Sequence, residues 1–225
     1  MAAGRSQGAL GLIMKAVISG LDAQSHVVHA LHDSMRDWPE TNCYTDLWIE
    51  VLHALDLAPQ AMLGFTVRQD FEGDQFTFFK PSLDEIEALY NITTTELSIF
   101  DDVEQHALAQ IRRGRLPLIE VDSHYLPDTR GITYRQSHSK TTVAVNVLDP
   151  AARRMDYFHN AGYFTLNGDD YDGLFGRLPQ DQSAVRLFPY VEFVKIPERR
   201  QQPAKGLSEE LLARHLARRP AGNPF

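Results

Sequence analysis

Apolar residues recur at four-residue intervals in the segment TNCYTDLWIEVLHALDL, which holds the clearest periodic pattern in the chain. Leu47, Val51 and Leu55 form one stripe, and Trp48 and Leu52 widen it. This spacing matches the turn of an α-helix, so it predicts a helix with one buried face.

The predicted helix starts at the only cysteine of the chain. Cys43 follows Asn42, a residue type that caps helices, and precedes Leu47 on the apolar stripe by one turn. A lone thiol in such a place is most often a buried hydrophobic residue. The positive end of a helix is also where a nucleophilic thiolate is stabilised. The pattern alone leaves both interpretations open.

Two further helices are predicted before the pattern changes. The segment SLDEIEALY combines Ser82 and Glu85 in the spacing of a capping box. The segment DDVEQHALAQIRRG has acids at its start and arginines at its end, which suits the helix dipole. Gly114 closes it as a stop signal.

Strand-like segments dominate the second half of the chain. Four short segments are rich in β-branched or aromatic residues: LPLIEVD (116–122), TTVAVNVL (141–148), RMDYFHN (154–160) and YVEFVKI (190–196). The turn sequence DPAAR joins the second to the third and predicts an antiparallel hairpin. Helices followed by strands predict an α+β fold.

The sequence patterns predict three parts of the chain. Residues 1–20 form an N-terminal extension, 21–197 the main domain, and 198–225 a linker with a short basic amphipathic helix. Within the main domain, the alternation of Phe76 and Phe78 predicts one more strand with an apolar face.

Composition narrows the class of protein. The chain has 225 residues, a hydrophobic fraction of 43% and a net charge of -8, which argues against electrostatic binding of nucleic acid. A single cysteine excludes an internal disulfide and favours a reducing cytoplasm. No apolar run approaches the length of a membrane span, and Lys15 interrupts the only signal-like stretch.

If Cys43 is a nucleophile, it needs a base and a group that orients the base. His138 is the preferred base, because it stands at the entry of a strand whose neighbouring positions on the same side include the small residues Thr142 and Ala144. Small residues there would let the cysteine helix approach the strand closely. The next predicted strand ends in FHN, which would bring Asn160 or its neighbouring histidine beside His138.

Four segments together resemble a known family: TNCYTDLWIEVLHALDL, GRLPLIEVDSHYLPDT, YRQSHSKTTVAVNVLD and RMDYFHNAGYF. They resemble a bacterial family, domain of unknown function 1839, related to the N-terminal domain of butirosin biosynthesis protein H. The resemblance covers Leu21 to Ile196 and implies a papain-like fold, with the cysteine helix packed on a mostly antiparallel sheet. The related domain is an acyltransferase that moves an aminoacyl group from a carrier-protein thioester to an amine.

The resemblance implies roles for particular residues. Cys43 matches the nucleophile, His138 the base and Asn160 the third member of a triad. A glutamine that papain-like enzymes place before the cysteine is missing, so Asn42 and the backbone N–H of Cys43 are expected to hold the oxyanion. Because an amide cannot stabilise the imidazolium charge as a carboxylate does, a flanking acid such as Asp149 or Asp156 is expected to support it.

The segment EVDSHYLPDT offers polar side chains near the histidine strand. We expect these residues to shape the substrate channel, and their spacing fits no strong metal motif, so no metal is expected. The predicted substrate-binding residues are Asp122, His124, Tyr125 and His159. The histidines of HVVHALH (His26, His29 and His32) are expected to be solvated on a helix surface.

The sequence therefore predicts a cysteine acyltransferase that uses no cofactor of its own and receives its acyl group on a carrier protein's phosphopantetheine arm. An amine would accept the group. A cysteine peptidase or thioesterase, and a non-catalytic module that binds a carrier protein, stay open as alternatives. Because carrier proteins are normally acidic, the arginines of QIRRGR and ERR are candidate docking residues.

Overall fold

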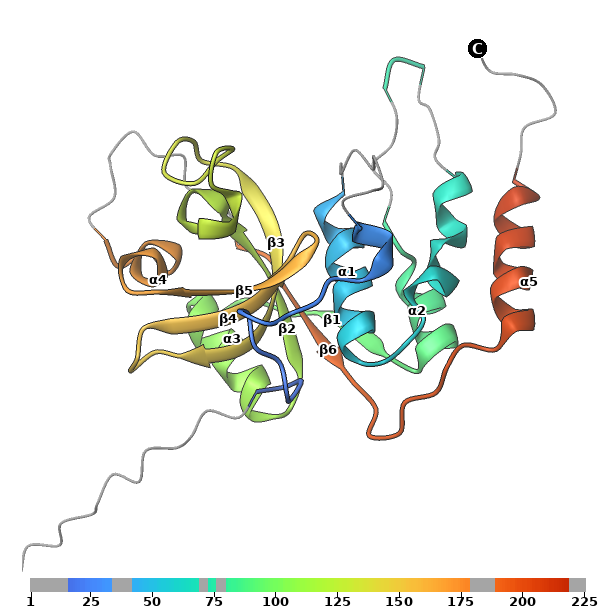
Figure 1. Ribbon diagram of the computed structural model, residues 1–225, viewed down its shortest axis with the longest axis horizontal. Coiled ribbons are helices and arrows are strands. Elements are labelled where there is room, and N and C mark those ends of the chain that lie inside the picture. Colours follow the sequence, from blue (N-terminus) through green and yellow to red (C-terminus); the bar gives the residue numbers. More distant parts are fainter. Residues whose placement is uncertain (1–15, 34–41, 69–72, 76–79, 179–188, 219–225) are drawn as a thin grey trace, which may run out of the picture.

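The computed structural model describes residues 16–33, 42–68, 73–75, 80–178 and 189–218 (Figure 1). The strand predicted around Phe76 and Phe78, and most of the predicted N-terminal extension, lie outside these residues.

A six-stranded antiparallel sheet forms the centre of the described part of the chain. Its spatial order is β1-β6-β2-β3-β4-β5. The strands are β1 (Thr93–Glu96), β2 (Leu116–Asp122), β3 (Lys140–Asp149), β4 (Arg154–His159), β5 (Gly162–Asn167) and β6 (Val191–Lys195). The four predicted strands are confirmed as β2, β3, β4 and β6, and the hairpin that joins β3 to β4 is confirmed as well. The sequence did not predict β1 and β5.

Helices cover both faces of this sheet, which confirms the α+β class. The α-helices described are α1 (Cys43–Ala54), α2 (Leu83–Tyr90), α3 (Val103–Arg112), α4 (Asp169–Leu174) and α5 (Lys205–Leu216). The 3₁₀ segments are η1 (Ala30–His32), η2 (Pro59–Arg68), η3 (Ser123–Tyr125) and η4 (Pro127–Thr129). α1, α2 and α5 lie on one side, and α3 and α4 on the other (Figure 1).

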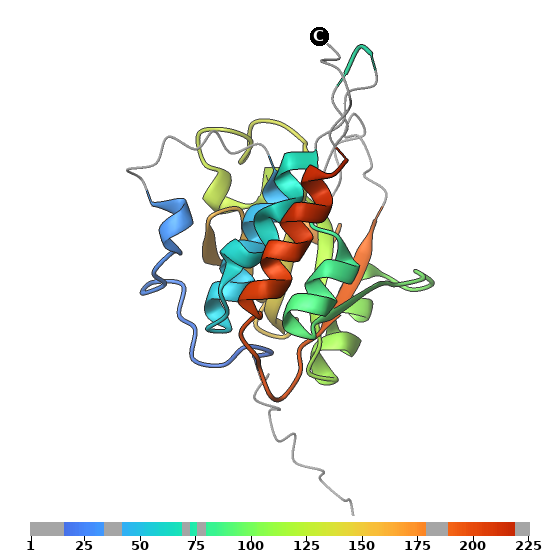
Figure 2. The ribbon, with the colours of Figure 1, turned by 90° about the vertical axis from the view of Figure 1, so that its right-hand side faces the viewer.

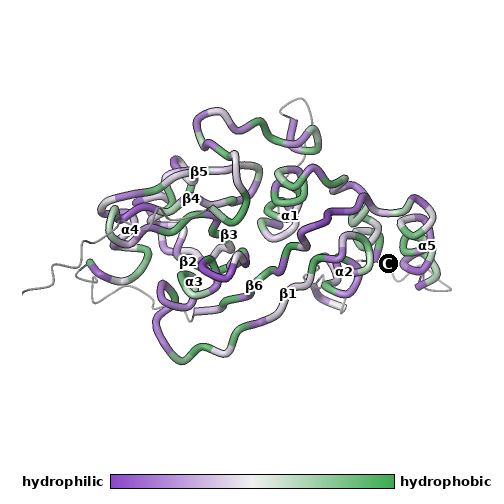
Figure 3. The backbone as a smooth tube through the Cα atoms, turned by 90° about the horizontal axis from the view of Figure 1, so that it is seen from below, coloured by the Kyte–Doolittle hydropathy of each residue, from purple (hydrophilic) through white to green (hydrophobic). Residues whose placement is uncertain are grey.

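Successive side chains of the central strands point to opposite faces of the sheet and pack in two separate apolar cores. Leu118 and Ala144 pack in the cluster that contains the apolar residues of α1. Ile119 and Val143, their neighbours in sequence, pack in the cluster that contains α3. Figure 3 shows the strands between α1 and α3. The face of β3 predicted to receive the cysteine helix is therefore the face on which α1 packs.

α1 is buried on all sides rather than on one face. Every residue from Tyr44 to Leu52 is buried, and the acidic Glu50 is among them. The helix packs on β3, β4 and β5 and also against η2, which accounts for the burial of its second side.

The C-terminal helix packs within the chain. α5 (red) runs beside η2 (teal) in Figure 2, and the two segments are in contact. Leu211 is buried in this contact, and His215 forms an ion pair with Glu85 of α2 at 2.9 Å.

Candidate active site

Cys43 is the first residue of α1, as the sequence pattern predicts. The side chain of Asn42 caps the helix by accepting a hydrogen bond from the N–H of Thr45 at 3.1 Å. The thiol is only partly buried, whereas the residues that follow it are buried. A thiol in the first turn lies near the positive end of the helix, where a thiolate is favoured.

Two contacts fix the direction of α1 on the sheet. At its start, the hydroxyl of Tyr44 donates to Oε2 of Glu192 in β6 at 2.6 Å. At its end, Nη1 of Arg200 donates to the carbonyl of Leu55 at 3.1 Å, and Arg200 lies beyond the end of β6. α1 therefore runs in the same direction as β6, with its thiol end at the start of that strand.

The start of β6 lies at the same end of the sheet as His138. Glu192 pairs with Leu118 of β2, and further along β2 the last residue, Asp122, pairs with Lys140, the first residue of β3. His138 stands two positions before Lys140. Because only β2 separates β6 from β3, about 10 Å lies between these two strands. The structure thus brings the thiol end of α1 and the predicted base to one end of the sheet.

A carboxylate holds the imidazole of His138. Nδ1 of His138 lies 2.5 Å from Oδ2 of Asp122. The other oxygen, Oδ1, accepts backbone N–H groups from His124 at 3.0 Å and Ser139 at 3.3 Å, which fixes the carboxylate in turn. With Nδ1 engaged, Nε2 is the ring nitrogen placed to exchange a proton. The His138 side chain is 32% exposed, so the site is open to solvent.

Two predicted substrate-channel residues lie against this pair. The ring of His124 stacks on that of His138 with centroids 4.4 Å apart and an angle of 13° between the planes. The ring of Tyr125 packs edge-on against His124 at 4.9 Å. Asp122, the last residue of β2, and His124 and Tyr125 of η3 are therefore grouped near His138.

The prediction that Asn160 orients His138 is wrong. Asn160 lies in the tight turn between β4 and β5 with a φ of 44°, a left-handed conformation that asparagine tolerates better than most residues. Its Oδ1 is buried and has no hydrogen-bond partner among the residues described. Turn geometry explains this asparagine, and Asp122 is the group that contacts the imidazole.

The prediction that Asp149 supports the base is also wrong. Asp149 ends β3, whereas His138 precedes its start, and nine residue steps of a strand span about 30 Å. The carboxylate instead accepts the N–H groups of Ala151 and Ala152, both at 3.0 Å, and stabilises the hairpin turn. Asp156, the alternative, is held by Arg154 and Thr165.

A comparison with protein families matches residues 27–196 to the DUF1839 N-terminal domain. The chain belongs to this family. A search of curated proteins finds no match. The matched part contains α1, all six strands of the described sheet and the His138–Asp122 pair, and it ends before α5.

In this DUF1839 domain, His159 belongs to a second, buried network. Its Nδ1 lies 2.5 Å from Oδ2 of Asp128, and its Nε2 lies 2.8 Å from the hydroxyl of Thr141. Tyr157 donates to the other oxygen of Asp128 at 2.5 Å. His159 is 1% exposed and joins η4 to the sheet. The prediction that His159 lines the substrate channel is therefore wrong.

Two carboxylates that the sequence did not reveal lie on the sheet face below the start of α1. Glu192 is buried and lies 3.8 Å from Nζ of Lys80. Glu120 of β2 lies on the same face and pairs with Nζ of Lys140 at 2.5 Å. These positions depend on the register of three strands and on the direction of α1, which a single sequence does not show.

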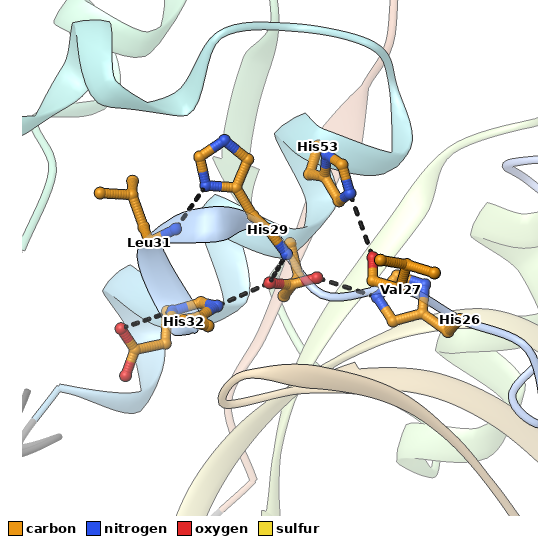
Figure 4. A network of polar contacts seen from close by, with 8 residues as sticks. His26, Val27, His29, Leu31, His32 and His53 are labelled. Atoms are coloured by element: carbon orange, nitrogen blue, oxygen red, sulfur yellow. Dashed lines mark hydrogen bonds and ion pairs between the residues drawn. The ribbon is translucent and has the colours of Figure 1, made fainter. Parts of the chain in front are cut away.

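The prediction that the histidines near the N-terminus are solvated is wrong. They converge on a buried acid (Figure 4). We call residues 16–33 the N-terminal strap. Glu50 of α1 accepts hydrogen bonds from His26 Nε2 at 2.8 Å, His32 Nδ1 at 2.6 Å and the backbone N–H of His29 at 3.0 Å. His32 Nε2 also lies 3.2 Å from Asp46. These contacts, which we call the histidine cluster, bind the strap to α1.

Electrostatics within the histidine cluster favour charged partners. Burial opposes the charged form of His32, but its hydrogen bonds with Asp46 and Glu50 raise its pKa to about 9. Burial likewise opposes the charge of Glu50, yet the hydrogen bond with His32 lowers the pKa of Glu50 below its ordinary value. The cluster is thus an ion-paired clamp at neutral pH.

Among the residues described, no three or more His, Cys, Asp or Glu side chains are arranged to hold a metal ion. Within the same ranges, no helix combines the length and the apolar character needed to cross a bilayer.

Proposed function

We propose that this DUF1839 protein is a papain-like cysteine acyltransferase that takes an aminoacyl or other acyl group from a carrier-protein thioester and passes it to an amine. The observation that carries the proposal is the arrangement at one end of the sheet. A partly exposed thiol at the positive end of α1 lies at the same end as an imidazole held by a carboxylate. A nucleophile, a base and an orienting acid are the three groups that such chemistry requires.

The first step transfers the acyl group to the enzyme. The thiolate of Cys43 attacks the carbonyl carbon of the carrier thioester, a new C–S bond forms, and the bond to the carrier sulfur breaks. One thiolate replaces another, so the step is close to thermoneutral and needs little acid catalysis. The proton that Cys43 gave to His138 on ionising passes to the departing sulfur, so the carrier leaves as its free thiol and His138 is neutral again.

The second step transfers the acyl group to the acceptor. As the amine nitrogen bonds to the carbonyl carbon, Nε2 of His138 takes its proton, and the C–S bond to Cys43 breaks. Asp122 keeps the ring in the orientation that presents Nε2 and stabilises the imidazolium. The proton then returns to the Cys43 thiolate, which restores the enzyme.

Donors for the oxyanion lie at the start of α1. The first N–H groups of a helix have no acceptor within the helix, and the N–H of Cys43 is one of them. Asn42 stands beside this N–H and is the residue proposed to assist it; its side-chain oxygen accepts the N–H of Thr45. The two groups would hold the negative oxygen that develops on the attacked carbonyl.

The carrier protein would dock at the thiol end of the sheet. The arginines of QIRRGR precede Leu116, the first residue of β2, so they lie about 20 Å from Asp122 at the opposite end of that strand. Arg200 is likewise bound to the far end of α1. Exposed basic residues at the thiol end are Arg130, Arg135 and Lys140. An acidic carrier would be attracted there.

Intact-mass measurement under single-turnover conditions tests the proposal. Incubation with an acyl-pantetheine thioester should add the mass of the acyl group to the wild-type protein, and Cys43→Ala should abolish the addition. Added amine should then remove the acyl group as an amide. Loss of the acyl group as free acid without an amine would identify a thioesterase instead. No addition at all would leave only a binding module.

A further inference from the structure

We propose that Glu192 and the ring of Tyr44 form a subsite for an ammonium group on the acyl substrate, and that Lys80 occupies it in the free protein. This inference rests on the proposed function, because it places the ammonium next to the acylated thiol. It narrows the substrate class to acyl groups that carry a primary amine near their carbonyl.

Glu192 is a buried acid with an organised set of donors. Its side chain is 2% exposed and accepts hydrogen bonds from the hydroxyls of Tyr44 at 2.6 Å and Tyr190 at 3.0 Å. Burial, with the nearby Glu192 carboxylate, raises the pKa of Tyr44 and of Tyr190, so both hydroxyls stay protonated and donate. A carboxylate fixed in this way is preorganised to bind a cation.

A cation already occupies the place where a substrate ammonium would bind. Nζ of Lys80 lies 3.8 Å from Oε1 of Glu192 and 4.8 Å from the centre of the Tyr44 ring. A carboxylate beside an aromatic face is the combination that recognises alkylammonium groups. Among the residues described, Lys80 is the only cation paired with Glu192.

Lys80 is a displaceable occupant. Its side chain is 44% exposed, and 3.8 Å exceeds the length of a direct hydrogen bond. A long flexible ammonium chain can therefore swing into water and leave its place to a ligand of the same charge. The carboxylate and the ring stay in place, because the sheet and the first turn of α1 hold them.

The subsite is built on the residue that follows the reacting thiol in α1. Tyr44 directly follows Cys43, so an acyl group bound to the thiol would extend over the sheet face that carries Glu192. Glu120 lies on the same face, but its partner Lys140 contacts it directly at 2.5 Å. Among the residues described, Glu120 thus has a closer counter-ion than Glu192 and no aromatic ring as a partner, which makes Glu120→Gln a matched control.

The first experiment compares one cationic substrate with a larger and a smaller neutral one. Single-turnover acylation of Cys43 is followed by intact mass with alanyl-pantetheine and with N-acetylalanyl-pantetheine, and with propionyl-pantetheine as a smaller neutral substrate. The wild-type protein should favour the alanyl substrate by about tenfold or more. Glu192→Gln should remove the preference, and Lys80→Met should increase it. An unchanged preference in Glu192→Gln, or its loss in Glu120→Gln instead, would overturn the assignment.

The second experiment does not depend on acyl transfer. Alaninamide, a cationic ligand, and propionamide, its neutral analogue, are titrated into Cys43→Ala while protein NMR signals are followed. Alaninamide should perturb the signal of Tyr44, bind more tightly when Lys80→Met is added, and fail to bind when Glu192→Gln is added. Equal binding of alaninamide by the Glu192→Gln variant would overturn the subsite. If Cys43 is never acylated but alaninamide binds as described, the proposed function fails and the subsite stands.

Discussion

The His138–Asp122 pair and the histidine cluster contain the same chemical groups, imidazole and carboxylate, in opposite environments. The His138–Asp122 pair stands on a segment at the end of the sheet, and the His138 side chain is 32% exposed. In the histidine cluster, His26 and His32 are nearly buried, and the side chain of Glu50 has no exposed surface.

This difference in burial separates their roles. A buried ion pair cannot exchange protons freely, and the loss of one partner leaves an uncompensated charge, so the histidine cluster acts as a structural clamp. An exposed imidazole with one nitrogen engaged can give and take a proton at the other. Under the proposed function, His138 would therefore transfer protons, whereas His32 contributes to the stability of the fold.

The largest expected effect follows from disrupting the exposed His138–Asp122 pair. His138→Gln should slow transfer from Cys43 to the amine by about 10²- to 10⁴-fold while leaving acylation of Cys43 less affected, because the base acts mainly in the second step. Asp122→Asn should slow the same step. Stopped-flow or quenched-flow mass measurement separates the two steps. His53→Gln, a histidine outside the site, is the control, and an equal loss in that variant would contradict the assignment.

The second-largest expected effect follows from removing the charge of Glu50, the buried partner of His32. Glu50→Gln should lower the free energy of unfolding by about 3–5 kcal/mol, because it leaves the charged His32 without its buried partner. Urea denaturation measures the change. Glu87→Gln, on the exposed side of α2, should change stability by less than about 0.5 kcal/mol. A Glu50→Gln protein as stable as this control would show that the clamp contributes nothing.

The clamp should also make stability depend on pH. The folded-state pKa of His32 is raised from 6.5 to about 9, so its contribution is fully present below pH 6.5 and is lost as the pH rises through 9. The shift corresponds to about 3 kcal/mol at most. Urea titrations at several pH values across this window should show the loss in the wild type and a flatter profile in His32→Gln. Identical slopes would contradict the role of His32.

The smallest effect is expected for Asn160, which was predicted to orient His138 but does not contact it. Asn160→Gly should leave both transfer steps unchanged and alter stability by no more than about 1 kcal/mol, because glycine adopts positive φ readily and no hydrogen bond to Oδ1 is lost. Activity and urea measurements on this variant check both points. A large loss of transfer would restore Asn160 to the catalytic group.

Local sequence patterns predicted the main helices and strands well, because apolar residues repeat with a different spacing in a helix and in a strand. α1 and the strands β2, β3, β4 and β6 follow the spacing of apolar residues. β1 has the sequence TTTE, which offers no alternation of apolar and polar residues, so it could not be recognised. The three-residue spacing of the histidines in the strap predicts solvated side chains, but they converge on Glu50, and Ala30–His32 forms a single helical turn.

Only part of the candidate site could be predicted from a single sequence. Cys43 and His138 could be proposed from their positions at the starts of elements. The partner of His138 could not, because Asp122 meets it through the pairing of β2 with β3, and that register depends on the whole sheet. Glu50 was hidden for a similar reason, since its partners lie more than 15 residues away in the strap.

The central claim is that Cys43 and His138 face one another across a single site, and the single native cysteine allows a direct test. The variants His138→Cys and Asp149→Cys each add a second thiol, at the near and far ends of β3. Treatment with a short bis-alkylating reagent, followed by intact-mass and peptide analysis, reports whether the two thiols can be joined. The account predicts an intramolecular crosslink to Cys43 in His138→Cys and none in Asp149→Cys. No crosslink in His138→Cys, with both thiols singly alkylated, would contradict it.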